Sequence, residues 1–306
     1  MRELATMPEH PMVRRALILL VASASLFGLM AFTAKLAAAR LSGSQIAMVR
    51  FAIAILPVLL VPRYRRSASR IQRWDLLAYR GVFGGAAVLL YFLAIAKIPL
   101  GLATLLNYTA PLFSGIFAAV FIGEAIRRQV FIPLVIAFLG VLLVVRGHSL
   151  PEELIGFGRW ELLGLTSGML SGAAVTAIRV ARRTEGSWSI YASFSICGLL
   201  ATLPFAIATW KNPTAIEWVL LSGVGIFSIG AQLLMTYAFR WVETLIQGVI
   251  SQLAVVISMV LGVVLLGEKM TGQILAGSSL TIGGVVAVMF ISSRPRPVGF
   301  VEPAEQ

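Results

Sequence analysis

Residues 74–94 read WDLLAYRGVFGGAAVLLYFLA, and residues 218–238, which follow them at an offset of 144 positions, read WVLLSGVGIFSIGAQLLMTYA. Each stretch is apolar and has the length of about 20 residues that a helix needs to cross a bilayer. Without gaps, the pairs that this offset aligns include Trp74 with Trp218, Gly81 with Gly225, and Phe83 with Phe227. A Trp pair at one chosen offset arises by chance in only a few per cent of cases, roughly. The two stretches therefore indicate an internal repeat built from membrane helices.

The whole chain is similarly apolar. Of its 306 residues, 58% are hydrophobic and 12% are charged, and the mean hydropathy is +0.91. So few charges cannot cover a polar surface, which excludes ordinary soluble enzymes, nucleic-acid binders and disulfide-built secreted domains. The net charge of +12 comes from short basic clusters between apolar runs, which indicates topology rather than a nucleic-acid partner. The single Cys197 lies in an apolar run and forms no internal disulfide.

Charges, prolines and glycines divide the chain into ten apolar segments. They are 16–39, 45–62, 74–97, 100–122, 130–146, 160–181, 188–209, 217–239, 244–266 and 273–292. The first segment is a full span without a small-residue cleavage site, so we interpret it as a membrane helix and not as a signal peptide. The sequence predicts an all-α integral membrane protein with ten transmembrane helices. Its expected parts are repeats at 1–146 and 160–292 and a disordered cytoplasmic tail at 293–306.

The repeat extends beyond the two quoted stretches. Further pairs at the same offset are Gly28 with Gly172, Gly123-Glu124 with Gly267-Glu268, and Gly140 with Gly284. Each half holds five segments, an odd number, so the second copy must enter the membrane from the opposite side. Inverted repeats are the architecture of secondary transporters, whose substrate site lies near the midplane between the halves. We therefore expect two inverted five-helix repeats around a central cavity.

Lys and Arg are distributed unequally between alternate loops. One set is Arg2, Arg14, Arg15, Arg63, Arg65, Arg66, Arg70, Arg73, Arg127, Arg128, Arg182, Arg183, Arg240, Arg294 and Arg296. The other is only Arg40, Lys97, Arg146, Arg159, Lys211 and Lys269. Since cytoplasmic loops are enriched in Lys and Arg, this asymmetry predicts a protein of the cell (inner) membrane with both termini in the cytoplasm.

These features resemble the EamA branch of the drug/metabolite transporter superfamily. The resemblance rests on the five-plus-five spans, on Asn107-Tyr-Thr-Ala-Pro111 and on Gly123-Glu124 echoed by Gly267-Glu268, and it covers roughly 16–292. It implies a cavity lined by the first four helices of each half, with the fifth and tenth outside, and transport of metabolites such as amino acids or their derivatives. One departure is that Pro111 aligns with Val255, so we expect the two copies to bend differently there.

Basic side chains inside predicted spans are the first candidates for function, because each costs about 2.5–3.5 kcal/mol at a helix centre. They are Lys35, Arg50, Arg80 and Arg179. The alternative is that they extend along their aliphatic stems to the interface, which we favour more for Arg80 and Arg179. Lys35 and Arg179 are partners in the repeat, and one basic residue toward each face suits gates. No Asp or Glu lies near a span centre, so the interior favours a substrate that carries a carboxylate.

Polar residues at helical spacing form matching stripes in the fourth and ninth spans. The stripes are Thr104, Asn107, Pro111 and Ser114 in one half and Gln247, Ser251 and Ser258 in the other. Such stripes either line a cavity or hydrogen-bond between helices, and both can hold at once. Tyr91 and Tyr108 flank the first stripe and are the best aromatic candidates for the cavity.

The resulting site prediction has two parts. We expect the substrate to contact Lys35, Arg50, Tyr91, Asn107, Tyr108, Ser114, Gln247 and Ser251, and we expect gating or ion-pair roles for Arg80, Glu124, Arg179 and Glu268. A local ion pair is favoured over proton carriage for the two glutamates, which neighbour Arg127 and Lys269 at span ends. No metal site and no cofactor is expected.

Enzymatic motifs do not occur in the sequence. There is no G-x-S-x-G, H-E-x-x-H or P-loop, and both histidines, His10 and His148, fall in loops. The leading hypothesis is a secondary transporter that moves a small amphipathic or carboxylate-bearing metabolite by alternating access, with export of an amino acid or derivative favoured. Uptake of a vitamin or nucleoside-like metabolite is the alternative, followed by a channel or a structural membrane protein. The partners expected are this substrate and the lipid bilayer, with the oligomeric state open.

Overall fold

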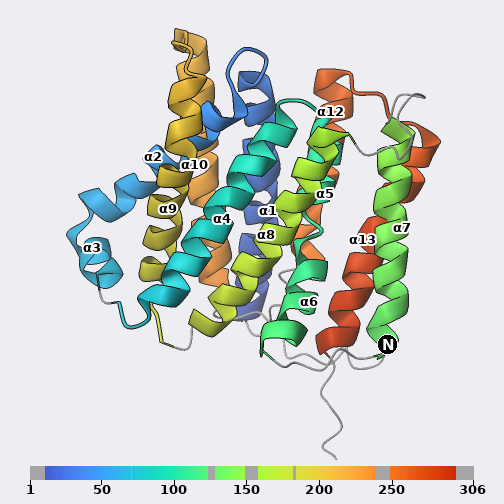
Figure 1. The fold of residues 1–306 in the computed structure, drawn as a ribbon, viewed down its shortest axis with the longest axis horizontal. Helices are drawn as coiled ribbons and strands as arrows, with labels where there is room; N and C mark the ends of the chain where they lie inside the picture. Colours follow the sequence, from blue (N-terminus) through green and yellow to red (C-terminus); the bar gives the residue numbers. More distant parts are fainter. Residues whose placement is uncertain are drawn as a thin grey trace, which may run out of the picture.

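The computed structural model describes residues 11–69, 71–122, 128–148, 158–181, 184–238 and 249–293, and in these ranges all regular structure is helical (Figure 1). The first half contains α1 (Pro11–Ala37), α2 (Gly43–Leu60), α3 (Pro62–Ala68), α4 (Trp74–Ile95), α5 (Leu100–Asn107), α6 (Ala110–Ile122) and α7 (Arg128–His148). The second half contains α8 (Arg159–Ala181), α9 (Ser187–Ala208), α10 (Ala215–Ala238), α12 (Leu253–Leu266) and α13 (Gly272–Ser293).

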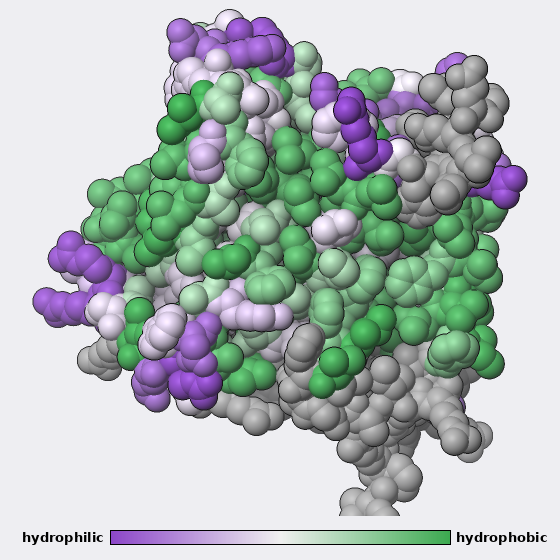
Figure 2. Space-filling model, viewed as in Figure 1, coloured by the Kyte–Doolittle hydropathy of each residue, from purple (hydrophilic) through white to green (hydrophobic). Residues whose placement is uncertain are grey.

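The described helices match the predicted apolar segments in position. Eight helical stretches in the described ranges are long and apolar enough to cross a membrane, and two shorter apolar stretches lie in α7 and α13. On the face shown in Figure 2, apolar side chains form a broad band, and polar ones gather at the top and at the lower left. The chain is therefore a multi-pass membrane protein. The sequence did not predict α3, which forms from the basic segment that follows α2.

Hydrogen bonds between helix ends sort the chain onto two faces. Face A holds the linkers 38–42, 96–99 and 209–214 together with 267–271. On it, Lys35 Nζ donates to Ile98 O at 2.6 Å, Gln45 Nε2 donates to Lys211 O at 2.7 Å, and Leu100 N donates to Glu268 Oε1 at 2.7 Å.

Face B holds α3 and residues 184–186. There Glu185 Oε1 accepts a hydrogen bond from Gln72 N at 2.8 Å, and Ser189 Oγ donates to Ser67 O at 3.1 Å. Helix α1 thus ends on face A, whereas its repeat partner α8 ends on face B. Likewise α2 begins on face A and α9 on face B. Equivalent helices run in opposite directions, as the inverted repeat predicts.

Helix packing follows the same two-fold relation. Helix α1 packs on α10 as α8 packs on α4, while α2 packs on its own partner α9, and α7 on α13. Individual contacts repeat as well. A Cβ at Gly28 would lie 2.7 Å from Ile257 Cγ2, and at the equivalent positions a Cβ at Gly172 would lie 2.7 Å from Phe113 Cβ. The same close approach of two helices at a glycine therefore occurs in both halves, and the second contact is inverted relative to the first.

The fourth apolar segment is interrupted in the middle of its span. Helix α5 ends at Asn107, residues 108–109 form a turn, and Pro111 lies in the first turn of α6, where its missing N–H costs little. The second half is also interrupted, at Gln252, which is the equivalent of Tyr108. There Val255 N donates to Gln252 O at 3.0 Å in a tightened turn that needs no proline. The two interruptions thus lie at equivalent positions but differ in form, a two-residue turn before Pro111 in the first half and a single residue with helical dihedral angles in the second. That the two copies bend differently at Pro111 and Val255 stays a prediction.

Candidate functional site

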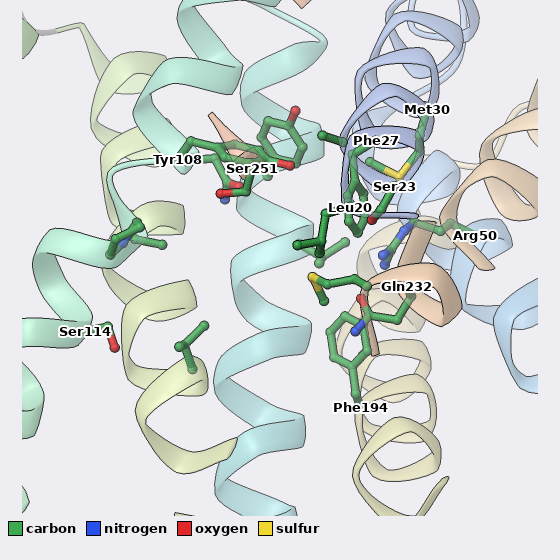
Figure 3. A pocket seen from close by; sticks show the side chains of 18 of the residues that line it. Leu20, Ser23, Phe27, Met30, Arg50, Tyr108, Ser114, Phe194, Gln232 and Ser251 are labelled. Atoms are coloured by element: carbon green, nitrogen blue, oxygen red, sulfur yellow. The ribbon is translucent and has the colours of Figure 1, made fainter. Parts of the chain in front are cut away.

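A cavity of about 260 Å³ lies between the two halves (Figure 3). Its lining includes residues of α1, α2, α4, α6, α8, α9 and α10, the interruption at 107–108, and Ser251 next to the second interruption. Leu20 and Met235 line it near the start of α1 and the end of α10, on the side of face B, where they belong to a small apolar cluster. On its other side, Met30 and Tyr91 belong to a large cluster of buried apolar side chains that continues to Ala37 and Leu100 at face A. This packing closes the cavity from face A.

Equivalent positions of the two halves meet in the cavity wall. Four pairs at the 144 offset line it: Arg50 with Phe194, Val88 with Gln232, Tyr91 with Met235, and Asn107 with Ser251. The cavity therefore lies on the pseudo-two-fold axis. Since the paired residues differ in chemistry, the wall is asymmetric although the backbone is repeated.

Arg50 provides a buried positive charge in this wall. Only 4% of the residue is exposed, and its guanidinium carbon lies 4.9 Å from the ring centre of Phe51 and 5.6 Å from that of Phe194. Figure 3 shows its nitrogen atoms turned toward the side of the cavity formed by Ser23 and Gln232. Within the described part of the chain, Arg50 Nε and Nη1 are buried without a hydrogen-bond partner. Two donors of a buried cation are thus left for another molecule to satisfy.

The side chain of Arg80 does not extend to the membrane interface, which is the position that the sequence analysis favoured. It is only 7% exposed, and its guanidinium carbon stacks on Phe194 at 4.2 Å from the ring centre. Its Nη1 occupies the place that a Cβ of Gly84 would take. Because α4 begins on face B, Gly84 lies one turn deeper than Arg80, and the side chain points away from that interface. Arg80 is not among the residues that line the cavity.

The predicted stripe of the first half combines both of its proposed roles. Asn107, Tyr108 and Ser114 all line the cavity, as does Ser251 in the other half. Asn107 Nδ2 also donates to Ser167 Oγ at 3.0 Å, which joins α5 to α8. The same residues thus join helices and face the cavity, while substrate contact by them remains a prediction.

The two tyrosines selected from the sequence also lie at the cavity. Tyr91 OH and Thr104 Oγ1 are 3.0 Å apart, which orients the Tyr91 ring, and Tyr108 lies in the turn between α5 and α6. In contrast, Tyr191 OH donates to Ala54 O at 2.9 Å, and Tyr237 is 54% exposed on the outer surface. Packing or an interfacial position accounts for the latter two.

Lys35 is not at the cavity, contrary to its predicted position among the substrate contacts. Its Nζ donates to Ile95 O at 2.9 Å and to Ile98 O at 2.6 Å, at the end of α4. Glu268 Oε1 accepts from Leu100 N, the first residue of α5. A cation at a helix C-terminus and an anion at a helix N-terminus are each favourable. Lys35 and Glu268, one from each half, thus hold the 96–99 linker at face A; we call this arrangement the linker clamp.

A second link between the halves at face A is ionic. Arg40 Nε and Nη2 donate to the carboxylate of Glu217. The hydrogen bonding to Glu217 raises the pKa of Arg40 above its ordinary value, so Arg40 keeps its charge throughout the physiological pH range. The equivalent contact on face B uses Glu185, whose Oε1 accepts hydrogen bonds from the backbone N–H groups of Gln72 and Arg73.

Three predicted residues have no described side-chain environment. Glu124 and Gln247 lie outside the described residues. Arg179 lies in α8, but the surroundings of its side chain are not described. Their predicted roles remain predictions.

Several lining residues were not predicted from the sequence. Phe194 and Gln232 face the cavity from α9 and α10, and Phe27 and Met30 from α1. The repeat itself held a signal for Phe194, because it is the partner of Arg50 at the 144 offset. Among the described residues, no group of three or more potential ligands is arranged to hold a metal ion.

The sequence of the chain matches known transporters over most of its length. The EamA-like transporter family matches it twice, over residues 14–146 and 158–290. The pseudopaline exporter CntI of Pseudomonas aeruginosa is 28% identical over 278 residues, which cover 90% of this chain and 96% of that protein. An S-adenosylmethionine uptake transporter of Rickettsia bellii is 25% identical, with 83% and 86% of the two chains covered.

A solved crystal structure with 20% sequence identity superposes on this chain with a TM-score of 0.59, covering 93% of this chain and 99% of the other. That similarity concerns the fold alone. The two family matches, the relatives and the transmembrane helices lead to one conclusion: this chain belongs to the EamA-like transporter family and is a membrane transporter rather than an enzyme.

Proposed function

We propose that this transporter moves a small amphipathic metabolite that carries a carboxylate, such as an amino acid or a derivative of one. The observation that carries the proposal is Arg50, a buried cation on the cavity wall with Nε and Nη1 unsatisfied in the described structure. None of the described lining residues is acidic. Phe27, Met30 and Tyr91 supply apolar surface beside it. A ligand with an anionic end and an apolar body matches both parts of this wall.

The energetics support an anion at this position. A buried charge without a hydrogen-bonding counter-ion is costly, and a guanidinium offers a carboxylate two parallel N–H donors. A cationic ligand would instead meet repulsion of about 4 kcal/mol at 4 Å and an effective dielectric of 20. Extrusion of lipophilic cations is therefore disfavoured at this cavity.

Alternating access follows from the relation between the halves. We take residues 1–146 and 160–292 as the two units that move against each other, and 293–306 as a cytoplasmic tail. Face A is closed by the linker clamp, by the Arg40–Glu217 pair and by a large apolar cluster, whereas the apolar cluster around Leu20 and Met235 on the face B side of the cavity is small. Face B carries exposed Arg63, Arg65 and Arg66 of α3, and the Lys/Arg rule assigns such a face to the cytoplasm. In this proposal the protein lies in the inner membrane, and the state described here is the one that loads substrate from the cytoplasm.

The direction of transport has two candidates. Similarity to a pseudopaline exporter favours export. Similarity to S-adenosylmethionine uptake transporters favours the second candidate, uptake of a nucleoside-like metabolite or a vitamin. Counterflow from preloaded vesicles of known orientation distinguishes the two.

The proposal is tested by flux in proteoliposomes with a panel of labelled amino acids and aromatic carboxylates, each compared with its amide. We expect saturable flux of one or more carboxylates. Arg50→Gln should weaken that affinity by about tenfold or more, since a charge-assisted hydrogen bond is worth about 1.5–3 kcal/mol. Arg50→Lys keeps the charge and should retain part of the affinity for the carboxylate.

Each measurement is made with and without an imposed pH gradient, because the sequence has no carboxylate near a span centre to carry a proton. Gradient-independent exchange is expected. Gradient-driven accumulation of a lipophilic cation that is unchanged in Arg50→Gln would overturn the proposal. Saturable flux also separates a transporter from a channel or a structural membrane protein.

A further inference from the structure

The side chain of Arg80 is held in an unusual direction for an arginine near a membrane interface. An arginine one turn inside a span normally extends toward water. Arg80 instead folds back over Gly84, where the missing Cβ leaves space for Nη1, and lies flat against the Phe194 ring. Its Nε is buried without a hydrogen-bond partner among the described residues. The local sequence therefore holds this charge inside the protein, where it is costly, although water lies one turn away.

Phe194 connects this buried charge to the cavity. The ring lines the cavity, and both guanidinium groups lie on it, that of Arg80 at 4.2 Å and that of Arg50 at 5.6 Å from the ring centre. Two like charges thus share one aromatic ring in a region of low dielectric. Neither of the ion pairs in the described structure, Arg40–Glu217 and Arg73–Asp75, includes them. A single carboxylate on Arg50 would neutralise only half of this charge.

We infer that Arg50 and Arg80 together select substrates that carry two negative charges over those that carry one. The inference rests on the proposed function, because it requires that a carboxylate binds at Arg50. Arg50 contacts the first anionic group directly, while Arg80, behind Phe194, raises the positive potential that the second group experiences. Arg80 is therefore a specificity-determining residue that acts through Phe194 and through space, without lining the cavity itself. The substrate class is a dicarboxylate with an apolar portion.

The test measures binding of two matched probes to the purified full-length protein. N-benzoyl-glutamate has two carboxylates, and N-benzoyl-glutamine has nearly the same shape with one. We expect the parent to bind the first about tenfold more tightly, the effect of one added charge interaction at a moderate distance and effective dielectric. Arg80→Gln should reduce this ratio to about one while it changes the affinity for N-benzoyl-glutamine by less than about threefold. If Arg80 had only a structural role, Arg80→Gln would weaken the binding of both probes to the same extent.

Two further variants keep the test independent of folding. Gly84→Ala retains the charge but places a methyl group where Arg80 Nη1 lies, and it should also lower the ratio. Arg80→Lys should keep part of the preference. The control is Arg73→Gln, on the same side of α4 but paired with Asp75 at 2.7 Å and exposed, which should leave the ratio unchanged.

The outcomes separate this inference from the proposed function. A parent ratio near one, no binding of either probe, or a ratio that persists in both Arg80→Gln and Gly84→Ala overturns the two-charge selectivity. The proposed function fails separately, if Arg50→Gln leaves the affinity for the singly charged probe and the flux of carboxylates unchanged.

Discussion

Gln252 Nε2 donates a hydrogen bond to the carbonyl oxygen of Tyr108 at 3.4 Å, and these two residues occupy the same position in the two halves of the chain. Each marks the point where a membrane-spanning segment is interrupted. The interruptions thus meet on the pseudo-two-fold axis, directly beside Asn107 and Ser251 of the cavity wall. Backbone groups released by a break inside a membrane must find partners within the protein. Here the break in one half is satisfied by a side chain from the break in the other.

This contact predicts that Gln252 matters for both stability and transport. Gln252→Leu leaves the Tyr108 carbonyl without that donor and should lower the free energy of unfolding by about 1 kcal/mol, together with reduced flux. The control is Gln273→Leu, which removes a similar bond, from Gln273 Nε2 to Leu143 O at 3.2 Å, far from the cavity. Thermal unfolding in detergent and flux in proteoliposomes are measured. Equal flux in the two variants would show that the contact between Gln252 and Tyr108 has no role in transport.

The polar stripes predict loss of transport without loss of folding. Asn107→Leu and Ser251→Leu remove polar groups from equivalent sites of the cavity wall, and we expect each to abolish transport at near-normal folded yield. Ser279→Leu is the matched control, because Ser279 is exposed on α13 and bonds only within its own helix, to Leu275 O. Size-exclusion profiles report folding, and flux reports function. Parent-like transport by both cavity variants would place the substrate elsewhere.

The linker clamp predicts a gate at face A. Lys35→Gln and Glu268→Gln each weaken a charge-assisted bond to the ends of α4 and α5, so face A should open more often. The reporter is Val88→Cys, on the cavity wall, in a Cys197→Ser background. Labelling by a membrane-impermeant maleimide added on face A should become several-fold faster, as expected when about 1 kcal/mol of closing energy is lost.

Lys211→Gln serves as the control for this gate, since Lys211 bonds to Gln45 only through its backbone. Its labelling rate should equal that of the parent. If Lys35→Gln and Glu268→Gln also label at the parent rate, the clamp has only a structural role.

The two faces predict a definite topology. Single cysteines at Arg66 and Gly186, on face B, should be protected from impermeant reagents added to intact cells, because the Lys/Arg asymmetry assigns that face to the cytoplasm. Cysteines at Lys211 and in the 147–159 segment should be labelled. Labelling of both Arg66→Cys and Gly186→Cys from outside would contradict the ten-span arrangement.

The pairing of α7 with α13 predicts a sharp difference between two adjacent glycines. A Cβ at Gly284 would lie 2.7 Å from Ala137 N, whereas one at Gly283 would meet nothing within 4 Å. Gly284→Val should therefore cost about 1–3 kcal/mol through overpacking, and Gly283→Val should cost little. Neither α7 nor α13 lines the cavity, so the affinity of folded protein for substrate should be unchanged in both variants. Thermal unfolding and ligand binding on the same preparations provide the check.

Some residues of the cavity wall were recognisable in the sequence for a physical reason. Arg50 stands out because a charge in an apolar run is costly wherever the helix packs, and Asn107 with Ser251 stand out because a stripe needs only helical periodicity and the repeat offset. Each signal is local or periodic. The predicted binding roles still await the experiments above.

The sequence by itself determined where the spans lie, that the two halves are inverted, and that basic charge collects at alternate span ends. Hydropathy, span parity and residue composition decide these features before any helix packs. Only the tertiary structure decided that Arg80 turns inward onto Phe194, that Lys35 bonds to the linker at the end of α4 instead of facing the cavity, and that the second half breaks at Gln252 without a proline. A side chain's direction depends on the space that neighbouring helices leave, as at Gly84, and on the partners they bring within reach, and neither is encoded in the local pattern.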